Sequence, residues 1–312
     1  MLIERWFQQS ENKFIQQVRN LFQPPQENPL SYSSPGSRTM RLAYLSHARE
    51  RLQNGRTTHS LPAYMPVPLA EGIELFVPSF APGMGQALDL ITHFRGGTPQ
   101  IFAKMNIPAL IVRADTPGLA GAMQKRFGKK HWAQQTREAV LQACWQEWRW
   151  LPILDRHILS SFGAGYAPLA SALEQELVVH QTDAVFVLDG IHYGRPGKID
   201  RESLEPFLRF AKLAARGHKL MVISHTQIQP PFASAADTAH YLSRQVKARR
   251  IALDSELADD WNPASYAGIG NFHVESYPGN TAESHIAQIQ QIGHLWGRYL
   301  DQSKQSAGQF RI

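Results

Sequence analysis

From about residue 60 onward, short apolar runs alternate with stretches of helical periodicity. The apolar runs are rich in Val, Ile, Leu and Phe, which is typical of strands buried on both faces of a sheet. These runs cover residues 72–80, 87–94, 108–112, 157–162, 184–188, 219–224 and 271–276. Apolar residues recur with a helical period between several of them, most clearly over residues 131–148, 166–177, 201–216 and 233–247.

This alternation predicts an α/β fold with a mostly parallel central sheet and helices on both faces. In such a sheet, ligands bind beyond the carboxyl ends of the strands. The residues that directly follow each predicted strand are therefore the first candidates for a functional site. The connecting segments at 78–86, 113–130, 190–200 and 226–235 have no regular pattern and are expected to be loops.

The first 38 residues differ in pattern from the rest of the chain. Apolar residues at near-helical spacing predict an amphipathic helix over residues 2–22, and a Pro- and Ser-rich linker follows at 24–38. We therefore predict an appendage at 1–38 and an α/β domain at 39–312. The helix is a candidate for docking a partner or another subunit.

Composition excludes several classes of protein. Of 312 residues, 43% are hydrophobic and 19% charged, which excludes disorder as the main state. No apolar run reaches the roughly 18–20 residues that a membrane-spanning helix needs. Cys144 is the only cysteine, which excludes an intrachain disulfide and a cysteine-built zinc site. The first 25 residues contain charges and no unbroken apolar segment, so we expect no signal peptide and a cytoplasmic protein.

The net charge of +6 includes two local basic clusters, at 125–130 and 244–250. Such clusters can bind an anionic polymer, or they can be solvated helix ends. No nucleic-acid-binding signature accompanies them, so we favour solvated helix ends and expect no specific nucleic-acid partner.

Candidate chemistry begins where the predicted strand at 157–162 ends. The letters F-G-A-G-Y over residues 162–166 describe a strand, a tight turn and the start of a helix. Small residues around the centre of such a turn prevent a clash between strand and helix, as in the nucleophile elbow G-x-S-x-G. The central residue is Gly163, where a hydrolase would have serine. By itself, the pattern is also typical of a packing turn.

Other strand ends add polar residues in a suggestive order. Asp189 directly follows the strand at 184–188, and His285 follows the strand at 271–276. Earlier in the chain, the strand at 87–94 ends in His93 and Phe94, and Arg95, Gly96 and Gly97 follow. This segment is similar to the H-G-G type loop whose backbone N–H groups stabilise an oxyanion.

An elbow, then an acid, then a histidine is the chain order of the α/β-hydrolase superfamily, and the chain resembles that superfamily over residues 60–300. The resemblance implies serine-type hydrolysis of an ester or amide bond in a small-molecule or polymer acyl substrate, with no cofactor. His285 would be the base, Asp189 would orient it, and Ala164 with Phe94, Arg95 or Gly96 would form the oxyanion hole.

Two departures from the family pattern stand out. Gly163 has no attacking oxygen, so the chain as written is expected to be an inactive hydrolase. Asp189 follows the strand next after the elbow strand, one strand earlier than the commonest position of the acid. No carboxylate follows the strand at 219–224 before Asp237, so Asp189 is the better acid.

Several alternatives remain open at this point. Gly163 has replaced a serine by substitution, marks a natural loss of the nucleophile, or forms only a packing turn. The protein is then either a hydrolase scaffold or a non-catalytic binding or structural protein. Tyr166, His192 and His225 are candidates for substrate binding. His93, His192 and His225 at strand ends raise the question of a metal, but no metal-binding spacing supports one, and none is expected.

Overall fold

The computed structural model describes residues 64–79, 81, 87–97, 101, 107–253 and 258–308. Contacts divide the chain into two units, Met1–Pro62 and Ala63–Ile312, and the described residues all belong to the second. The predicted helix at 2–22, the linker at 24–38 and the domain boundary after residue 38 lie outside the described residues and stay predictions.

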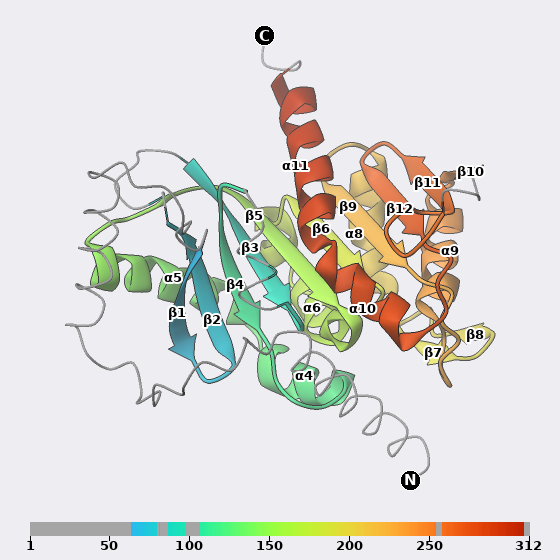
Figure 1. Cartoon of the computed structure of the whole chain (residues 1–312), viewed down its shortest axis with the longest axis horizontal. Coiled ribbons are helices and arrows are strands. Elements are labelled where there is room, and N and C mark those ends of the chain that lie inside the picture. Colours follow the sequence, from blue (N-terminus) through green and yellow to red (C-terminus); the bar gives the residue numbers. More distant parts are fainter. Residues whose placement is uncertain are drawn as a thin grey trace, which may run out of the picture. The chain divides into compact units, whose positions relative to one another are not determined.

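Within the described residues, a ten-stranded sheet has the order β1-β2-β4-β3-β5-β6-β9-β12-β11-β10 (Figure 1). From β4 to β12 all neighbouring strands are parallel, whereas β2 runs antiparallel to β1 and β4. The strands are β1 (Tyr64–Ala70), β2 (Ile73–Pro78), β3 (Ala87–Phe94), β4 (Ala109–Ala114), β5 (Ile153–Phe162), β6 (Ala184–Leu188), β9 (Leu220–His225), β10 (Arg249–Ala252), β11 (Ser265–Ile269) and β12 (Phe272–Ser276). The predicted fold class is confirmed: the architecture is of the α/β-hydrolase type.

Helices cover both faces of this sheet. They are α4 (Ala120–Phe127), α5 (Trp132–Trp148), α6 (Tyr166–Leu173), α7 (Glu176–Gln181), α8 (Glu205–Ala215), α9 (Ala235–Gln245), α10 (Ala282–Gln290) and α11 (Ile292–Gly308). Every residue of β6 and β9 is buried, as expected for central strands with covered faces. Successive residues of each strand therefore pack into two different cores.

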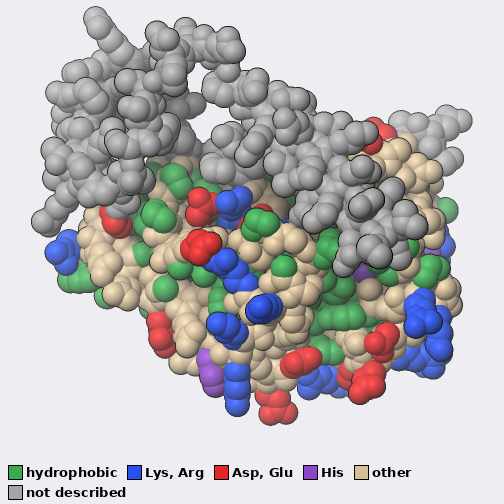
Figure 2. All heavy atoms as spheres, turned by 90° about the horizontal axis from the view of Figure 1, so that it is seen from below, with side chains coloured by type: hydrophobic (Ala, Val, Ile, Leu, Met, Phe, Trp, Pro, Cys, Tyr) green, Lys and Arg blue, Asp and Glu red, His purple; other side chains and the backbone are tan. Residues whose placement is uncertain are grey.

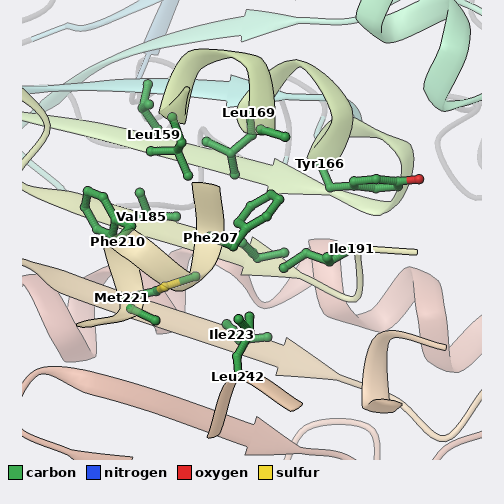
Figure 3. Close-up of a cluster of buried hydrophobic side chains, with 14 of the residues drawn as sticks. Leu159, Tyr166, Leu169, Val185, Ile191, Phe207, Phe210, Met221, Ile223 and Leu242 are labelled. Carbon is green, nitrogen blue, oxygen red and sulfur yellow. The ribbon is translucent and has the colours of Figure 1, made fainter. Parts of the chain in front are cut away.

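One core lies between the sheet and helices α6, α8 and α9. Figure 3 shows strand residues such as Val185 and Ile223 packed against Phe207 and Leu242 of these helices. Tyr166 lies at the margin of this cluster, with its hydroxyl group directed away from it. The first residue of α6 thus contributes to the core while it presents a polar group elsewhere.

The other core lies on the opposite face, under α10 and α11. Phe186 and Val222 point to this side, because they alternate with the residues that face α8. Ile289 of α10 and Trp296 of α11 pack against them, and Trp296 is fully buried. This packing anchors α10, which begins shortly after the end of β12.

The structure corrects several local predictions. Residues 113–130, expected to be a loop, contain α4, and the expected loop at 190–200 contains the small hairpin of β7 (Gly194–Arg195) and β8 (Lys198–Ile199). The predicted helix at 166–177 is two helices, α6 and α7. These elements are short, and their apolar residues are too few for periodicity to reveal them.

Both basic clusters include the C-terminal turn of a helix. Lys125 and Arg126 lie in the last turn of α4, and Arg244 lies in the last turn of α9. Positive charge at these positions complements the helix dipole. On the face seen in Figure 2, basic and acidic side chains are interspersed rather than separated.

The order of the strands marks where a ligand would bind. From β3 the chain crosses to β4 on one side, and later returns to β5 on the other side of β3. The carboxyl ends of β3 and β5 therefore flank a topological switch point, the usual position of a binding crevice in an open α/β sheet. The loop at Phe94–Gly96 and the turn at Gly163 follow these two strands.

Candidate active site

The turn after β5 has the geometry of an elbow. Residues Gly163–Gly165 form one turn of 3-10 helix between Phe162 and the start of α6 at Tyr166. Gly163 is buried and has φ +48°, in the left-handed region that strains residues with a side chain. A sharp reversal directly after a strand requires such a conformation at its apex.

Two neighbouring glycines let three backbone segments meet at this elbow. A Cβ atom on Gly165 would overlap the Phe94 carbonyl oxygen. A Cβ on Gly190, in the turn after β6, would lie 2.8 Å from the Gly163 carbonyl oxygen. The ends of β3, β5 and β6 therefore pack backbone against backbone, with no room for side chains between them.

Asp189 is placed and held by main-chain and side-chain donors. It directly follows β6 with φ +41°, and its carboxylate is buried. The Thr226 N–H donates to Oδ1 at 3.0 Å, and the Thr226 hydroxyl donates to Oδ2 at 2.6 Å. Burial acts to raise the pKa of Asp189, but hydrogen bonds from His285 and Thr226 outweigh it and lower the pKa to about 2. The side chain is therefore a carboxylate at neutral pH.

His285 lies in α10, not on a loop as its position after the last strand suggests. The turn at Pro278 and Gly279 ends the extended chain, and the Thr281 hydroxyl caps the helix by accepting from the Ser284 N–H. His285 is therefore in the first turn of α10. Its ring stacks on Phe162 at a centroid distance of 4.4 Å, which fixes the plane of the imidazole beside the elbow.

The structure brings Gly163, Asp189 and His285 together. Nδ1 of His285 donates to Asp189 Oδ2 at 2.7 Å. Because a carboxylate only accepts, Nδ1 carries the hydrogen and Nε2 of the neutral ring has a free lone pair. A Cβ atom on Gly163 would lie 3.2 Å from this Nε2. The basic nitrogen thus faces the position where the side chain of residue 163 would begin.

The segment after β3 lies against the elbow, but two of its N–H groups already have acceptors. A Cβ on Gly96 would be 3.0 Å from the Phe162 ring, which shows how close the two segments are. The Arg95 N–H donates to the Ala114 carbonyl at 2.9 Å, and the Gly96 N–H donates to Asp115 Oδ2 at 3.1 Å. An oxyanion role for Gly96 therefore requires that the substrate displace the Asp115 carboxylate.

The three candidate substrate-binding residues have different surroundings. His192 is partly buried, packs edge-on against Tyr166 at 5.7 Å and donates through Nδ1 to the Ala233 carbonyl at 3.2 Å. Burial lowers its pKa to about 4, so it is neutral at pH 7. His225 is fully buried behind Thr226, and its Nδ1 donates to the Thr226 carbonyl at 3.0 Å. We infer a supporting position for His225 rather than contact with substrate.

His93 lies on the side of the sheet covered by α11. Its Nδ1 is 3.0 Å from Ser160 Oγ, and its ring meets Trp296 edge-on. Burial lowers its pKa to about 3. The histidines at the strand ends therefore do not converge: within the part of the chain that the structure describes, no group of three His, Cys, Asp or Glu side chains could hold a metal ion.

Sequence reasoning missed three residues that shape this site. Thr226 donates to the Asp189 carboxylate, Phe162 stacks on the imidazole ring of His285, and Asp115 accepts a hydrogen bond from the Gly96 N–H. Thr226 and Asp115 directly follow β9 and β4, so the search for polar residues after strands could have found them. The contact of Phe162 with His285 has no counterpart in the sequence pattern.

No protein-family model matches the sequence, and no curated protein matches it. Solved structures with a similar chain trace include ferric enterobactin esterase from Salmonella typhimurium (13% identity, TM-score 0.46, 79% of this chain and 60% of that chain). An S-formylglutathione hydrolase from Agrobacterium tumefaciens has 9% identity and a TM-score of 0.44, over 78% of this chain and 98% of that one. Enterobactin esterase from Shigella flexneri has 11% identity and a TM-score of 0.48, over 78% and 61% of the two chains.

The present chain thus spans about three fifths of the length of the two enterobactin esterases. These comparisons concern the fold of the chain alone. The strand order of the sheet and the helices on its two faces are of the α/β-hydrolase type. In the described part of the chain, no helix is both long enough and apolar enough to cross a membrane.

The close approach at Gly165 predicts a large effect of one methyl group. Gly165→Ala should lower the free energy of unfolding by about 1–3 kcal/mol or more, because the new Cβ meets backbone that cannot move aside alone. Gly121→Ala in helix α4 is the control, since a Cβ at that position would have no neighbouring atom within 4 Å among the described residues. It should be neutral or stabilising by up to about 1 kcal/mol. Equal denaturant midpoints for the two variants would contradict the elbow geometry.

The low pKa of Asp189 predicts a pH-dependent contribution to stability. A carboxyl whose pKa is depressed from 3.8 to about 2 in the folded state stabilises the fold above pH 4, and this stabilisation is lost as pH falls toward 2. The difference in unfolding free energy between the wild type and Asp189→Asn should shrink by about 2 kcal/mol between pH 5 and pH 2. Denaturant unfolding across this range measures it, and a constant difference would refute the prediction.

Proposed function

We propose that this chain carries the acyl-transfer site of a serine-type hydrolase of ester or amide bonds, in which Gly163 occupies the position of the nucleophile. The observation that carries the proposal is the alignment of three groups. Asp189 Oδ2 lies 2.7 Å from His285 Nδ1, and His285 Nε2 faces the point 3.2 Å away where a side chain at 163 would begin. This is the arrangement in which a carboxylate orients a base toward a nucleophile.

With serine at position 163, the mechanism follows from this geometry. His285 Nε2 takes the hydroxyl proton as the oxygen attacks the substrate carbonyl carbon, and Asp189 stabilises the imidazolium. The imidazolium then protonates the leaving group, and water releases the acyl group by the reverse sequence. Ala164 and the Phe94–Gly96 segment are the proposed oxyanion donors, with the Gly96 N–H released from Asp115 when substrate binds.

No neighbouring serine replaces the missing nucleophile. Ser160 and Ser161 are buried in β5 before the elbow, and the Ser160 hydroxyl is already paired with His93. The protein with Gly163 therefore forms no acyl-enzyme through a serine at this site. This holds whether Gly163 arose by substitution of a serine or by natural loss of the nucleophile.

We propose that the acyl substrate, a small molecule or a polymer, lies beside Tyr166 and His192. Tyr166 is the first residue of α6, with its ring against His192 and Tyr193. His192 packs in turn on Phe232, at a centroid distance of 4.9 Å. These rings make an apolar, aromatic wall, and a neutral His192 can accept or donate one hydrogen bond.

A second candidate function is a binding protein on the same fold that carries out no reaction. The glycine at the nucleophile position favours it, because residue 163 supplies no attacking oxygen of its own. The two candidates differ in what happens when a hydroxyl is introduced at position 163.

The Gly163→Ser form should react covalently with a fluorophosphonate probe, because Nε2 is in place to deprotonate the new hydroxyl. Labelling should vanish in Gly163→Ser/His285→Ala and be retained in Gly163→Ser/His218→Ala, since His218 is an exposed residue remote in the chain from the site. Positive φ at 163 should reduce the stability of the serine form by about 1–3 kcal/mol. A folded serine form that does not label would favour the binding protein.

In the Gly163→Ser form, Asp189→Asn should lower the turnover of an acyl substrate by about 10⁴-fold, because the amide no longer fixes the tautomer of His285. Thr226→Val tests the support of the acid: it removes the hydroxyl bond at 2.6 Å and should give a smaller loss in kcat. Circular dichroism verifies that each variant is folded. Equal turnover for Asp189→Asn and its parent would remove Asp189 from the mechanism.

A further inference from the structure

The space beside Gly163 is bounded by the basic nitrogen of His285. Among the described residues, the imidazole edge alone comes within 4 Å of a Cβ placed on Gly163, apart from the adjacent residues: Nε2 at 3.2 Å and Cε1 at 3.5 Å. An oxygen atom at that point would lie at hydrogen-bonding distance from Nε2. A serine hydroxyl is one source of such an oxygen, and a water molecule is another.

We propose that the chain with Gly163 is itself a hydrolase, in which the Asp189–His285 pair activates a water molecule bound in the space that Gly163 leaves. Activated esters are the chemical class of substrate. The inference rests on the acyl-binding part of the proposed function but not on its serine step. It assigns Gly163 a role, since any side chain there would occupy the position of the water.

The step balances without any further reactant. His285 Nε2 takes one proton from the water while the oxygen bonds to the acyl carbon, and the carbonyl becomes an oxyanion. When the carbonyl re-forms, the bond to the leaving alkoxide or phenoxide breaks, and the imidazolium returns the proton. The products are the carboxylic acid and the alcohol, and no covalent bond to the protein forms.

The surroundings of His285 suit a general base. Asp189 is a buried carboxylate whose partners Thr226 and His285 keep it ionised, so it stabilises the imidazolium that forms during attack. Stacking on Phe162 fixes the ring, so Nε2 does not reorient away from Gly163. A positioned general base contributes about 10²–10⁴ in rate.

The test compares position 163 in three forms, with p-nitrophenyl acetate as the substrate. Gly163→Ala adds the Cβ of serine without its oxygen, so it fills the water position and matches the backbone strain of Gly163→Ser. Wild type should hydrolyse the ester about 10²-fold faster than His285→Ala, without a burst of p-nitrophenol. Gly163→Ala should fall to the rate of His285→Ala, whereas His218→Ala should keep the wild-type rate.

One further measurement identifies the pathway. Mass spectrometry of the quenched wild-type reaction should find no acetylated protein, whereas Gly163→Ser should show a burst and a labelled residue 163.

The outcomes separate the two proposals. If wild type is no faster than His285→Ala, or if Gly163→Ala keeps the wild-type rate while folded, water activation is overturned. Fluorophosphonate labelling of Gly163→Ser would then still support the serine-type site. Suppose that wild-type turnover is lost in both His285→Ala and Gly163→Ala, but that the fluorophosphonate probe does not label Gly163→Ser. Water activation then stands, and the serine proposal fails.

Discussion

The hydrogen bond between Asp189 and His285 depends on the placement of strands β6 and β9 and of helix α10. It joins residues 96 positions apart in the chain, one from the turn after β6 and one from the first turn of α10. The carboxylate is buried, and such a charge is stable only when it is paired and hydrogen-bonded. Thr226, at the end of the adjacent strand β9, supplies two of the donors. Loss of the register between β6 and β9 would therefore leave a buried charge without its partners.

The backbone around this pair is held by close packing rather than by side chains. The elbow at Gly163–Gly165, the end of β3 and the turn at Gly190 approach within distances that exclude a methyl group. Such contact makes the elbow rigid and keeps its apex next to the imidazole. The same constraint explains why the turn needs small residues whether or not residue 163 reacts.

His285 is held from the opposite side by a different core. Helix α10 continues from His285 to Ile289, which packs with Trp296 of α11 under the sheet. Asp189 thus comes from the carboxyl end of the sheet, while His285 is positioned by a helix anchored on one of its faces. The orientation of the imidazole is consequently coupled to the packing of α10 and α11 on that face of the sheet.

The sequence by itself determined the alternation of strands and helices, the chain order of the Gly163 turn, Asp189 and His285, and the glycine at the apex of that turn. These are local properties, since buried strands are near-continuous apolar runs and a sharp turn requires residues without bulky side chains. The short elements α4, β7 and β8 were not predicted from the sequence, because each has too few residues to show a hydrophobic period. The structure placed His285 on helix α10 rather than on a loop. The tertiary structure alone decided that Thr226 supports Asp189 and that Asp115 accepts a hydrogen bond from the Gly96 N–H. Both contacts depend on how neighbouring strands align across the sheet, and no residue carries that alignment in its own local sequence.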